Sequence, residues 1–321
     1  MNQPLVSIII PTFNRGDYLV ETITSIINQS YRCWECIIVD DHSTDNTSNI
    51  VKEYSKKDLR IKYVMRPSER KGGGNAARNY GFEISKGKYI CWFDSDDIMY
   101  KENIRYKVEL LENYPNFDYC ISKVKYFDHI FCYENLYSEN NEFNIGTNLY
   151  RNYITGKISI LNVNPLWRRK ILLGKILYDE NIRQLQDLDF FSRIIYTNRK
   201  IGAIDKDLIF IRRKNNSITT ANSKQTIDVP SFLLVKNRII NRTPEDKEII
   251  LFSLKTVLWC MRLKMSERDY KNSRKCLKLC LENRNKLSLF MKVKIYRISV
   301  FYYFFEFLKI GDTMFKTFLK F

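Results

Sequence analysis

Residues 89–97 read Tyr-Ile-Cys-Trp-Phe-Asp-Ser-Asp-Asp, an apolar run that ends in three carboxylates within four positions. A short run of this kind is typical of a strand that is buried on both faces of a parallel sheet. Carboxylates packed so closely repel one another, so they need open water or a positive group among them. The stretch therefore predicts a buried strand with an unusual acidic cluster at its end, in a chain whose formal net charge is +17.

The same kind of apolar run recurs along the first 120 residues and alternates with segments of helical periodicity. The predicted strands are residues 5–10, 34–39, 61–65 and 89–93. Apolar residues at helical spacing predict helices within residues 17–27, 47–54, 77–84 and 104–111. This alternation predicts an α/β fold with a mostly parallel, Rossmann-like central sheet that is flanked by helices.

Polar residues cluster directly after three of these strands, at Pro11–Arg15, Asp40–Asp45 and Asp94–Asp97. Ligands of such sheets bind outside the carboxyl ends of the strands, so we expect the three clusters to share one ligand-binding rim. Aspartate, serine and threonine are also ordinary helix caps and turn residues. Asp45 in particular has the position of a cap.

The pattern is less regular after residue 125. Residues 134–157 read as a loop, residues 185–196 as a loop entering a helix, and residues 208–213 as a strand. From about residue 244 the periodicity is helical again. We therefore expect a second, helical region to follow the α/β domain.

The expected division falls at residue 225. The α/β domain covers residues 1–225, with one part to about residue 125 and a second part after it. Residues 226–321 form a helical extension, whose final stretch, residues 261–321, holds 15 Lys and Arg against 5 Asp and Glu. This charge predicts an anionic partner. The chain lacks a zinc-finger, RNP or helix-turn-helix signature, so we expect no specific nucleic-acid partner.

Bulk composition indicates a folded intracellular protein. Of its 321 residues, 45% are hydrophobic and 28% are charged, which supports a sizeable core. The apolar run at residues 5–10 is too short for a signal peptide or a membrane span, so we expect a cytoplasmic location. We interpret the eight cysteines as reduced thiols, because Cys33 and Cys36 would face opposite sides of one strand and could not share a zinc ion.

Five stretches resemble the motifs of glycosyltransferase family 2, whose members have the GT-A fold. They are SIIIPTFNR (7–15), IIVDDHSTD (37–45), GNAARNYG (74–81), FDSDD (93–97) and QDLDF (186–190). The resemblance implies transfer of a sugar from a nucleotide-sugar donor such as a UDP-sugar, usually with inversion and with Mn²⁺ or Mg²⁺ as cofactor. The implied acceptor is a glycan, in many relatives lipid-linked, in the synthesis of a bacterial surface polysaccharide such as capsule, O-antigen or lipopolysaccharide.

The acidic cluster at residues 94–97 then has a physical explanation. A nucleoside diphosphate is anionic, so carboxylates cannot bind it directly and a hard divalent cation must bridge the two. By similarity to the family, Asp96 is the expected metal ligand. Asp97 is a competing ligand, and Asp94 is expected to face the ribose or the metal.

The resemblance also implies a nucleotide-sugar site at the strand ends. The two aspartates after the second strand would hold the uridine, and Arg78, near a helix N-terminus, would neutralise the diphosphate. Arg212, Arg213 or Lys214 would hold the leaving diphosphate, because this stretch lacks the histidine that the family often has there. The expected set is Pro11, Thr12, Phe13, Arg15, Asp40, Asp41, Asn75, Arg78, Asp94 and Ser95.

Sugar transfer also needs a base that takes the proton of the acceptor hydroxyl. The chain has only two histidines, so we expect a carboxylate, and Asp187 matches the base position of the family. Gln186 replaces the glutamate that usually precedes this base, which removes one negative charge and alters a possible acceptor contact. Asp189 is the alternative base, and Trp167 is expected on the acceptor side.

Two other functions fit parts of the sequence. Residues 72–77, GGGNAA, satisfy the G-x-G-x-x-A pattern of NAD(P)-dependent oxidoreductases, with Asp94 near the offset of a ribose-binding acid. Six residues separate these glycines from the preceding strand, whereas that pattern needs a tight turn, so this function is disfavoured. The other alternative is a catalytically inactive nucleotide-sugar-binding protein, against which the intact acidic cluster and Asp187 argue.

The basic extension contains LSLFMKVKIYRISVFYYFFEFLKIG at residues 287–311. Its uninterrupted apolar part is too short to span a membrane. It predicts either a helix that packs on the rest of the chain or on a second subunit, or a helix in the interface of an anionic membrane. The membrane alternative implies peripheral attachment to the cytoplasmic face of the bacterial inner membrane.

Overall fold

A computed structural model describes residues 3–138, 146–197, 200–213 and 227–309. The chain divides into two compact units. The first, here the α/β unit, comprises residues 1–180 and 190–224, and the second, here the helical unit, comprises residues 181–189 and 225–321. Residues 181–189 thus group with the C-terminal helices, a grouping that the sequence does not predict.

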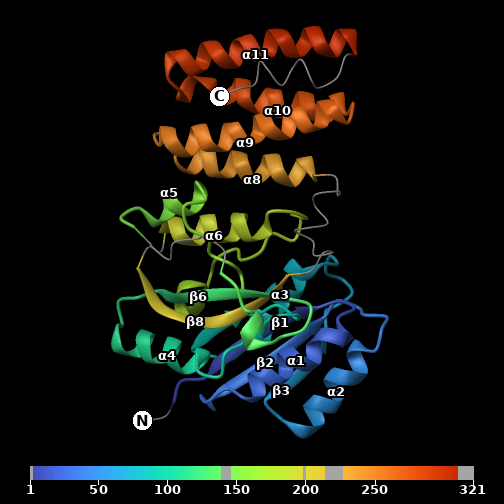
Figure 1. Cartoon of the computed structure of the whole chain (residues 1–321), viewed down its shortest axis with the longest axis vertical. Coiled ribbons are helices and arrows are strands. Elements are labelled where there is room, and N and C mark those ends of the chain that lie inside the picture. The colour runs from blue at the N-terminus through green and yellow to red at the C-terminus, as the bar shows by residue number, and fades with distance from the viewer. Residues whose placement is uncertain (1–2, 139–145, 198–199, 214–226, 310–321) are drawn as a thin grey trace. The chain divides into compact units, whose positions relative to one another are not determined.

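An eight-stranded sheet forms the centre of the α/β unit, in the order β3-β2-β1-β4-β7-β6-β8-β5. Figure 1 labels β1, β2, β3, β6 and β8 of this sheet. The strands are β1 (Val6–Thr12), β2 (Trp34–Asp40), β3 (Ile61–Met65), β4 (Tyr89–Trp92), β5 (Ile98–Met99), β6 (Tyr119–Asp128), β7 (Leu166–Arg168) and β8 (Ile201–Arg213). β1, β2, β3 and β4 are parallel, as are β6 and β8, whereas β7 and β5 pair antiparallel with their neighbours. The predicted α/β fold is confirmed, with a sheet that is mixed in its second half.

Helices pack on both faces of this sheet because alternate side chains of a strand point to opposite faces. The helices are α1 (Gly16–Ile27), α2 (Thr47–Lys57), α3 (Gly74–Ile84), α4 (Asn103–Asn113), α5 (Leu149–Ile154) and α6 (Gln186–Thr197). On one face, Ile8 and Ile38 share a core with Leu19 of α1. On the other face, Ile37 packs with Ala77 of α3.

Helix α3 approaches the sheet closely at Gly81. A Cβ atom at this position would lie 2.4 Å from Cγ2 of Ile9 and 3.1 Å from Cγ2 of Val39. A Cβ contact of 2.4 Å essentially never occurs, so glycine lets the helix lie at this depth. The close packing fixes α3, whose N-terminal turns carry two of the expected site residues.

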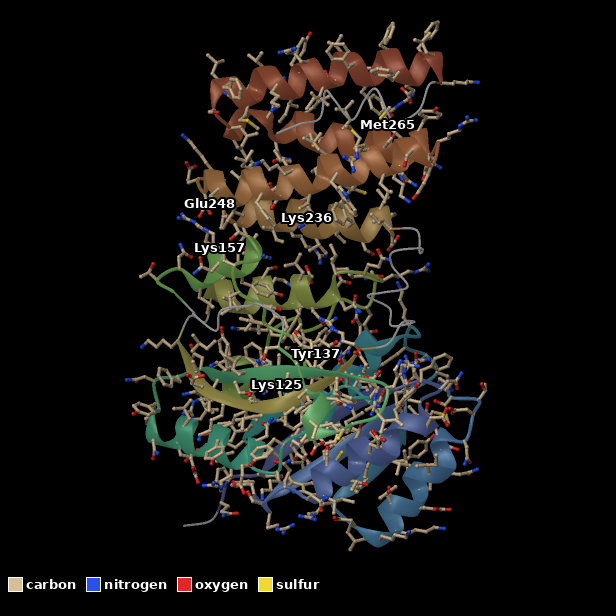
Figure 2. The ribbon with its side chains drawn as sticks, in the orientation of Figure 1. Lys125, Tyr137, Lys157, Lys236, Glu248 and Met265 are labelled. Carbon is tan, nitrogen blue, oxygen red and sulfur yellow. The ribbon has the colours of Figure 1, made fainter. Side chains whose placement is uncertain are left out.

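The structure differs from the sequence-based prediction of secondary structure in several places, and β8, predicted at residues 208–213, begins at Ile201. β6 was not predicted, because Lys123 and Lys125 interrupt its apolar pattern; they form ion pairs with Asp205 and Asp207 of β8 (Lys125 is labelled in Figure 2). The loop predicted for residues 134–157 contains two helical segments, α5 and a short 3₁₀ helix (Tyr133–Asn135) that begins just before it. The helical periodicity placed at residue 244 begins earlier, with a helix from Val229.

The helical unit stacks α8 (Val229–Arg242), α9 (Lys247–Ser266), α10 (Tyr270–Asn283) and α11 (Leu289–Leu308) in chain order (Figure 1). Asp246 and Asp269 cap α9 and α10, because their carboxylates accept hydrogen bonds of 3.1 Å from backbone N–H groups of the first turns. A continuous apolar core joins the four helices and includes Met265 (Figure 2). None of the helices in the described ranges has the length and apolar character needed to cross a membrane.

Residues 181–189 are tied to the start of α8 by hydrogen bonds. The backbone N–H of Arg183 donates to Oγ of Ser231 at 3.0 Å, and that of Asp228 donates to Oε1 of Gln184 at 2.9 Å. These bonds explain why the segment groups with the C-terminal helices. The first turn of α6 therefore belongs to the helical unit, whereas the rest of α6 belongs to the α/β unit.

Candidate active site

Residues 94–97 form an acidic turn directly after β4. Oδ1 of Asp94 accepts a hydrogen bond of 3.0 Å from Nη2 of Arg78, which lies near the start of α3. The Asp94 side chain is 37% exposed and that of Arg78 is 11% exposed. The structure thus brings together two of the expected site residues and leaves the carboxylate accessible to a ligand.

Asp97 differs from the other carboxylates of the acidic turn because it is buried, with only 4% exposure. Its Oδ1 accepts a hydrogen bond of 3.0 Å from the backbone N–H of Arg212, at the end of β8. Burial, followed by the neighbouring charges of Asp96 and Asp94, raises the pKa of Asp97 well above its usual range. Asp94 and Asp96 are half-buried, so they are the more accessible carboxylates.

Arg212 binds the acidic turn through hydrogen bonds to Asp96 and Asp97. Its Nε donates to the backbone oxygen of Asp96 at 3.0 Å, and its Nη atoms donate to the backbone oxygen of His129 and to the carboxylate of Glu21. The side chain is almost fully buried and packs against the ring of Phe127. The guanidinium was expected to bind the leaving diphosphate, but its donors are directed to protein acceptors.

The other cations expected at the diphosphate have different surroundings. The guanidinium carbon of Arg213 lies 4.4 Å from the centre of the Tyr126 ring. Lys214 lies outside the described residues. Among the expected diphosphate cations that the structure describes, Arg78 is the one whose side chain binds a carboxylate of the acidic turn.

Asp40, the last residue of β2, is fully buried and receives hydrogen bonds on both oxygens. Ser43 donates to Oδ1 from its backbone N–H at 2.8 Å and from its hydroxyl at 2.6 Å. The Tyr63 hydroxyl donates to Oδ2 at 2.6 Å. Asp40 was expected to contact uridine, and in the structure its carboxylate binds Ser43 and Tyr63 and thereby orders the turn after β2.

Asp41 is partly exposed and connects β2 to the loop before α3. Its Oδ1 accepts from Nε of Arg66, and its Oδ2 accepts from the backbone N–H of Gly73 at 2.6 Å. Gly73 has φ 121°, a conformation that favours glycine, and it immediately precedes α3. Eight residues separate β3 from Gly74, so the tight turn of a dinucleotide-binding motif is not formed.

The loops after β1 and β2 are bonded to each other. Oδ1 of Asn14 accepts from the backbone N–H of Thr44 at 2.8 Å, and Oδ2 of Asp45 accepts from that of Gly16 at 3.2 Å. Asp45 also accepts from the backbone N–H of Thr47 at 3.0 Å, so it caps helix ends as its position suggests. The two loops therefore present their side chains as one rim.

The expected residues on β1 and α3 have contrasting exposure. Phe13 is 53% exposed, whereas Thr12 is buried and its hydroxyl has no hydrogen-bond partner among the described residues. Asn75 is buried, and its Nδ2 donates to the backbone oxygen of Asp179 at 2.9 Å. Pro11 and Arg15 are half-buried and Ser95 is buried. Asn75 thus fixes the chain near residue 179, and Phe13 offers an open ring.

The candidate base lies in the first turn of α6, together with Gln186. Asp187 and Gln186 are half-buried. Asp189 is buried, and its Oδ1 accepts from Nη1 of Arg238 on α8 at 3.0 Å. Trp167, expected on the acceptor side, is fully buried on β7 and stacks on Tyr119 with ring centres 4.3 Å apart.

Three residues of this region were missed by sequence reasoning. Arg66 directly follows β3, so the strand-end rule that selected the other clusters could also have selected it. Tyr63 lies within β3, and Glu21 lies on an exposed face of α1, and neither carries a sequence signal. Their roles depend on partners 23 and 191 residues away in the sequence.

The chain matches known glycosyltransferases along much of its length. Residues 7–172 match the model of the family described as Glycosyl transferase family 2. An uncharacterized glycosyltransferase of Methanocaldococcus jannaschii is 32% identical over 217 residues, which cover 67% of this chain and 73% of that protein. An uncharacterized glycosyltransferase of Rickettsia conorii is 28% identical over 284 residues, which cover 85% of this chain and 44% of that protein. This chain thus spans less than half the length of the Rickettsia relative.

The solved structures with a similar fold include Staphylococcus aureus TarS 1–349. It superposes with a TM-score of 0.68 at 16% identity, over 95% of this chain and 87% of that one. This likeness supports the GT-A fold that the sequence predicted. The fold is therefore of the GT-A class, and the family match covers residues 7–172 of this chain. The chain belongs to glycosyltransferase family 2.

Proposed function

We propose that the protein transfers a sugar from a nucleotide-sugar to a hydroxyl group of a glycan acceptor, with inversion at the anomeric carbon. The observation that carries this proposal is the acidic turn with Arg78 beside it, in a chain of this family. A diphosphate leaving group needs cationic partners, and Arg78 is a nearly buried cation next to accessible carboxylates. The partner at this site is therefore an anionic donor.

We assign the donor to the UDP-sugars. One S. aureus TarS structure is a complex with UDP-GlcNAc, and it superposes on this chain with a TM-score of 0.67. In this chain the exposed ring of Phe13 offers a surface on which a base can stack. Pro11, Thr12 and Arg15 complete the β1 end of this site, while Asp41 and Asn75 shape it through their bonds to Gly73 and Asp179.

Mn²⁺ or Mg²⁺ is the proposed cofactor. The described residues hold no cluster of three or more His, Cys, Asp and Glu side chains that could hold a metal ion alone. The two half-buried carboxylates of Asp94 and Asp96 instead fit an ion that takes one or two carboxylates and completes its shell with phosphate oxygens. We assign Asp96 as the ligand, with Asp94 beside it. The bound ion would neutralise the diphosphate as it leaves.

Asp187 is the proposed base. It would accept the proton of the acceptor hydroxyl as that oxygen bonds to the anomeric carbon and the nucleoside diphosphate departs. Asp189, the alternative, is buried and its Oδ1 already accepts a hydrogen bond from Arg238, so this oxygen is directed to a protein partner. Gln186 can offer an amide to the acceptor without adding charge. The buried Trp167 then supports the acceptor side from within the core.

The proposed pathway is assembly of a bacterial surface polysaccharide, with a lipid-linked glycan as acceptor. A putative teichuronic acid biosynthesis glycosyltransferase of Bacillus subtilis is 41% identical over 109 residues, which cover 34% of this chain and 42% of that protein. A lipid-linked acceptor would place the protein on the cytoplasmic face of the inner membrane, attached peripherally.

A donor screen tests the proposal. Thermal unfolding would be followed with UDP-sugars, GDP-sugars and NADH, each with and without Mn²⁺. We expect one UDP-sugar to raise the unfolding temperature, and to do so much more with the ion. The same donor should then be hydrolysed slowly, and Asp187→Asn should abolish this turnover while keeping the thermal shift. Stabilisation by NADH alone, or binding without turnover in the wild type, would overturn the assignment.

A further inference from the structure

Helix α11 carries a continuous apolar face that is open to solvent. Its exposed members each have between 42% and 85% of their surface accessible. They are Leu289, Phe290, Val293, Tyr296, Val300, Tyr303, Phe304, Phe307 and Leu308. Their spacing of three and four residues places them on one side of the helix. Figure 2 shows side chains projecting from α11 on the side away from α10.

The opposite side of α11 is the one that holds the helix in its unit. Ile295, Ile298, Tyr302 and Phe305 are buried in the core that α11 shares with α9 and α10. The helix is therefore apolar on both sides, and within the described residues one of these sides is buried in the core. An apolar face of this size on a protein surface usually marks a site of interaction.

The charges around the exposed face have a single sign. Lys292 and Lys294 lie at its two borders, and Arg297 lies within it and is exposed. Glu306 is the only acidic residue among the described residues of α11. It is turned toward α10, where its Oε1 accepts from Arg274 at 2.9 Å. The face therefore offers apolar and cationic groups without an acidic one.

We propose that this face of α11 lies in the interface of an anionic lipid bilayer. Helices that lie in a bilayer interface combine a wide apolar face with basic residues at its borders, and aromatic side chains favour the headgroup level. Tyr296, Tyr303 and three phenylalanines supply such side chains here. The basic borders then contact the anionic headgroups while the apolar face enters the acyl boundary.

A second copy of the chain fits this face less well. A symmetric dimer pairs the same patch on both subunits. Two α11 faces in contact would bring Lys292, Lys294 and Arg297 of both copies into or beside one apolar interface, and no acidic residue in the described part of either face would offset them. An anionic surface satisfies both the apolar and the cationic groups at once.

This inference rests on the membrane part of the proposed function and not on the sugar-transfer chemistry. Flotation of the full chain with vesicles of phosphatidylglycerol or of phosphatidylcholine tests it. We expect flotation with the anionic vesicles, weakened by salt because exposed charges are screened. Replacing Lys292, Lys294 and Arg297 by Gln should weaken binding by about 100-fold, since each basic residue near such a surface contributes roughly five-fold.

A variant that lacks apolar residues of this face, compared with a matched control, distinguishes binding by the face from nonspecific hydrophobic binding. Val293→Ser, Val300→Ser and Phe307→Ser together should abolish flotation. Leu59→Ser and Ile176→Ser, which are exposed apolar positions of the α/β unit, should leave it unchanged. Circular dichroism would verify that each variant folds, and donor hydrolysis measured on the same samples would show whether transfer chemistry fails independently.

Four results would overturn the inference. The first is no flotation of the wild type with anionic vesicles, and the second is flotation of both α11 variants to the same extent as the wild type. The third is a dimer that the variant lacking apolar residues dissolves, which would make a second copy the occupant. The fourth is flotation of a chain that ends at Lys309 without flotation of the full chain, which would make residues 310–321 the occupant of the α11 face. Flotation without donor hydrolysis would instead count against the transferase proposal alone.

Discussion

Asp40 ends β2 and Asp94 lies just after β4, the two strands that flank β1, yet the two carboxylates have opposite surroundings. Asp40 is buried and receives three hydrogen bonds from Ser43 and Tyr63. Asp94 is partly exposed and is held by Arg78. An aspartate at a strand end can therefore order a loop or remain accessible to a ligand. The difference lies in its burial and in the number of protein groups that donate hydrogen bonds to its carboxylate.

The largest expected effect comes from the acidic turn. Asp96→Asn removes the proposed metal ligand, so we expect turnover to fall about 1000-fold, since metal coordination supplies several kcal/mol to the transition state. The unfolding temperature should stay equal or rise, because the carboxylates of the turn repel one another. Steady-state hydrolysis of the donor and thermal unfolding measure the two quantities. A variant with full activity would place the metal ligand elsewhere.

Asp40→Ala should give the reverse pattern. It leaves the donors of Ser43 and Tyr63 without their acceptor in a buried site, which costs about 3–4 kcal/mol of unfolding free energy. Urea denaturation measures this loss. Asp45→Ala is the matched control on the more exposed side of the same loop and should cost about 1 kcal/mol. Equal losses in the two variants would remove the contrast between Asp40 and its neighbour.

Arg212→Gln tests whether the acidic turn is positioned from behind. The variant loses the bonds to Asp96, His129 and Glu21, so we expect turnover to fall about 100-fold through misplacement of the turn. Glu21→Gln is the control: Glu21 is 43% exposed, so losing its charge should cost less than about 1 kcal/mol. If the variant instead bound the nucleotide-sugar more weakly and its turnover were unchanged, the result would indicate that Arg212 binds the diphosphate.

Lys236 extends the comparison to a buried cation (Figure 2). Burial lowers the pKa of Lys236 to about 8, because the charged amine loses water. The unfolded chain then binds more protons than the folded chain between that value and the usual lysine range, so folding becomes more favourable as pH rises through this window. Lys236→Met should stabilise the protein by about 2 kcal/mol at neutral pH and by less in alkaline solution. Denaturation curves at both pH values would show this, and an equal gain at both would refute it.

Much of the first half of the molecule could be predicted from the sequence. Short apolar runs identified β1, β2, β3 and β4, because buried parallel strands are nearly continuous in apolar residues. The strand-end rule then selected the acidic turn and the loops around Asp40. β6 was not predicted because lysines interrupt its apolar pattern. These lysines form ion pairs with carboxylates of β8, about 80 residues away in sequence. Pairing between distant strands leaves no local pattern.

The site residues were predictable by kind but not by role. The sequence shows three aspartates within residues 94–97, but only the structure shows that Asp97 is buried and bonded to the backbone of Arg212. Arg212 was expected at the diphosphate because its stretch of sequence lacks the histidine that the family often has there. The sequence does not reveal that the guanidinium donates to three protein acceptors. The exposed face of α11 was hidden for the same reason: its apolar residues occur all round the helix, and only packing shows which remain open.

The grouping of residues 181–189 with the C-terminal helices has a mechanical consequence. The proposed base is carried on the same compact body as α11, and the Asp189–Arg238 ion pair links its turn of α6 to α8. If α11 binds a lipid bilayer, Asp187 is held near the membrane because both lie in the helical unit. A growing glycan tethered to lipid would then meet a base whose height above the bilayer is set by a stack of four helices.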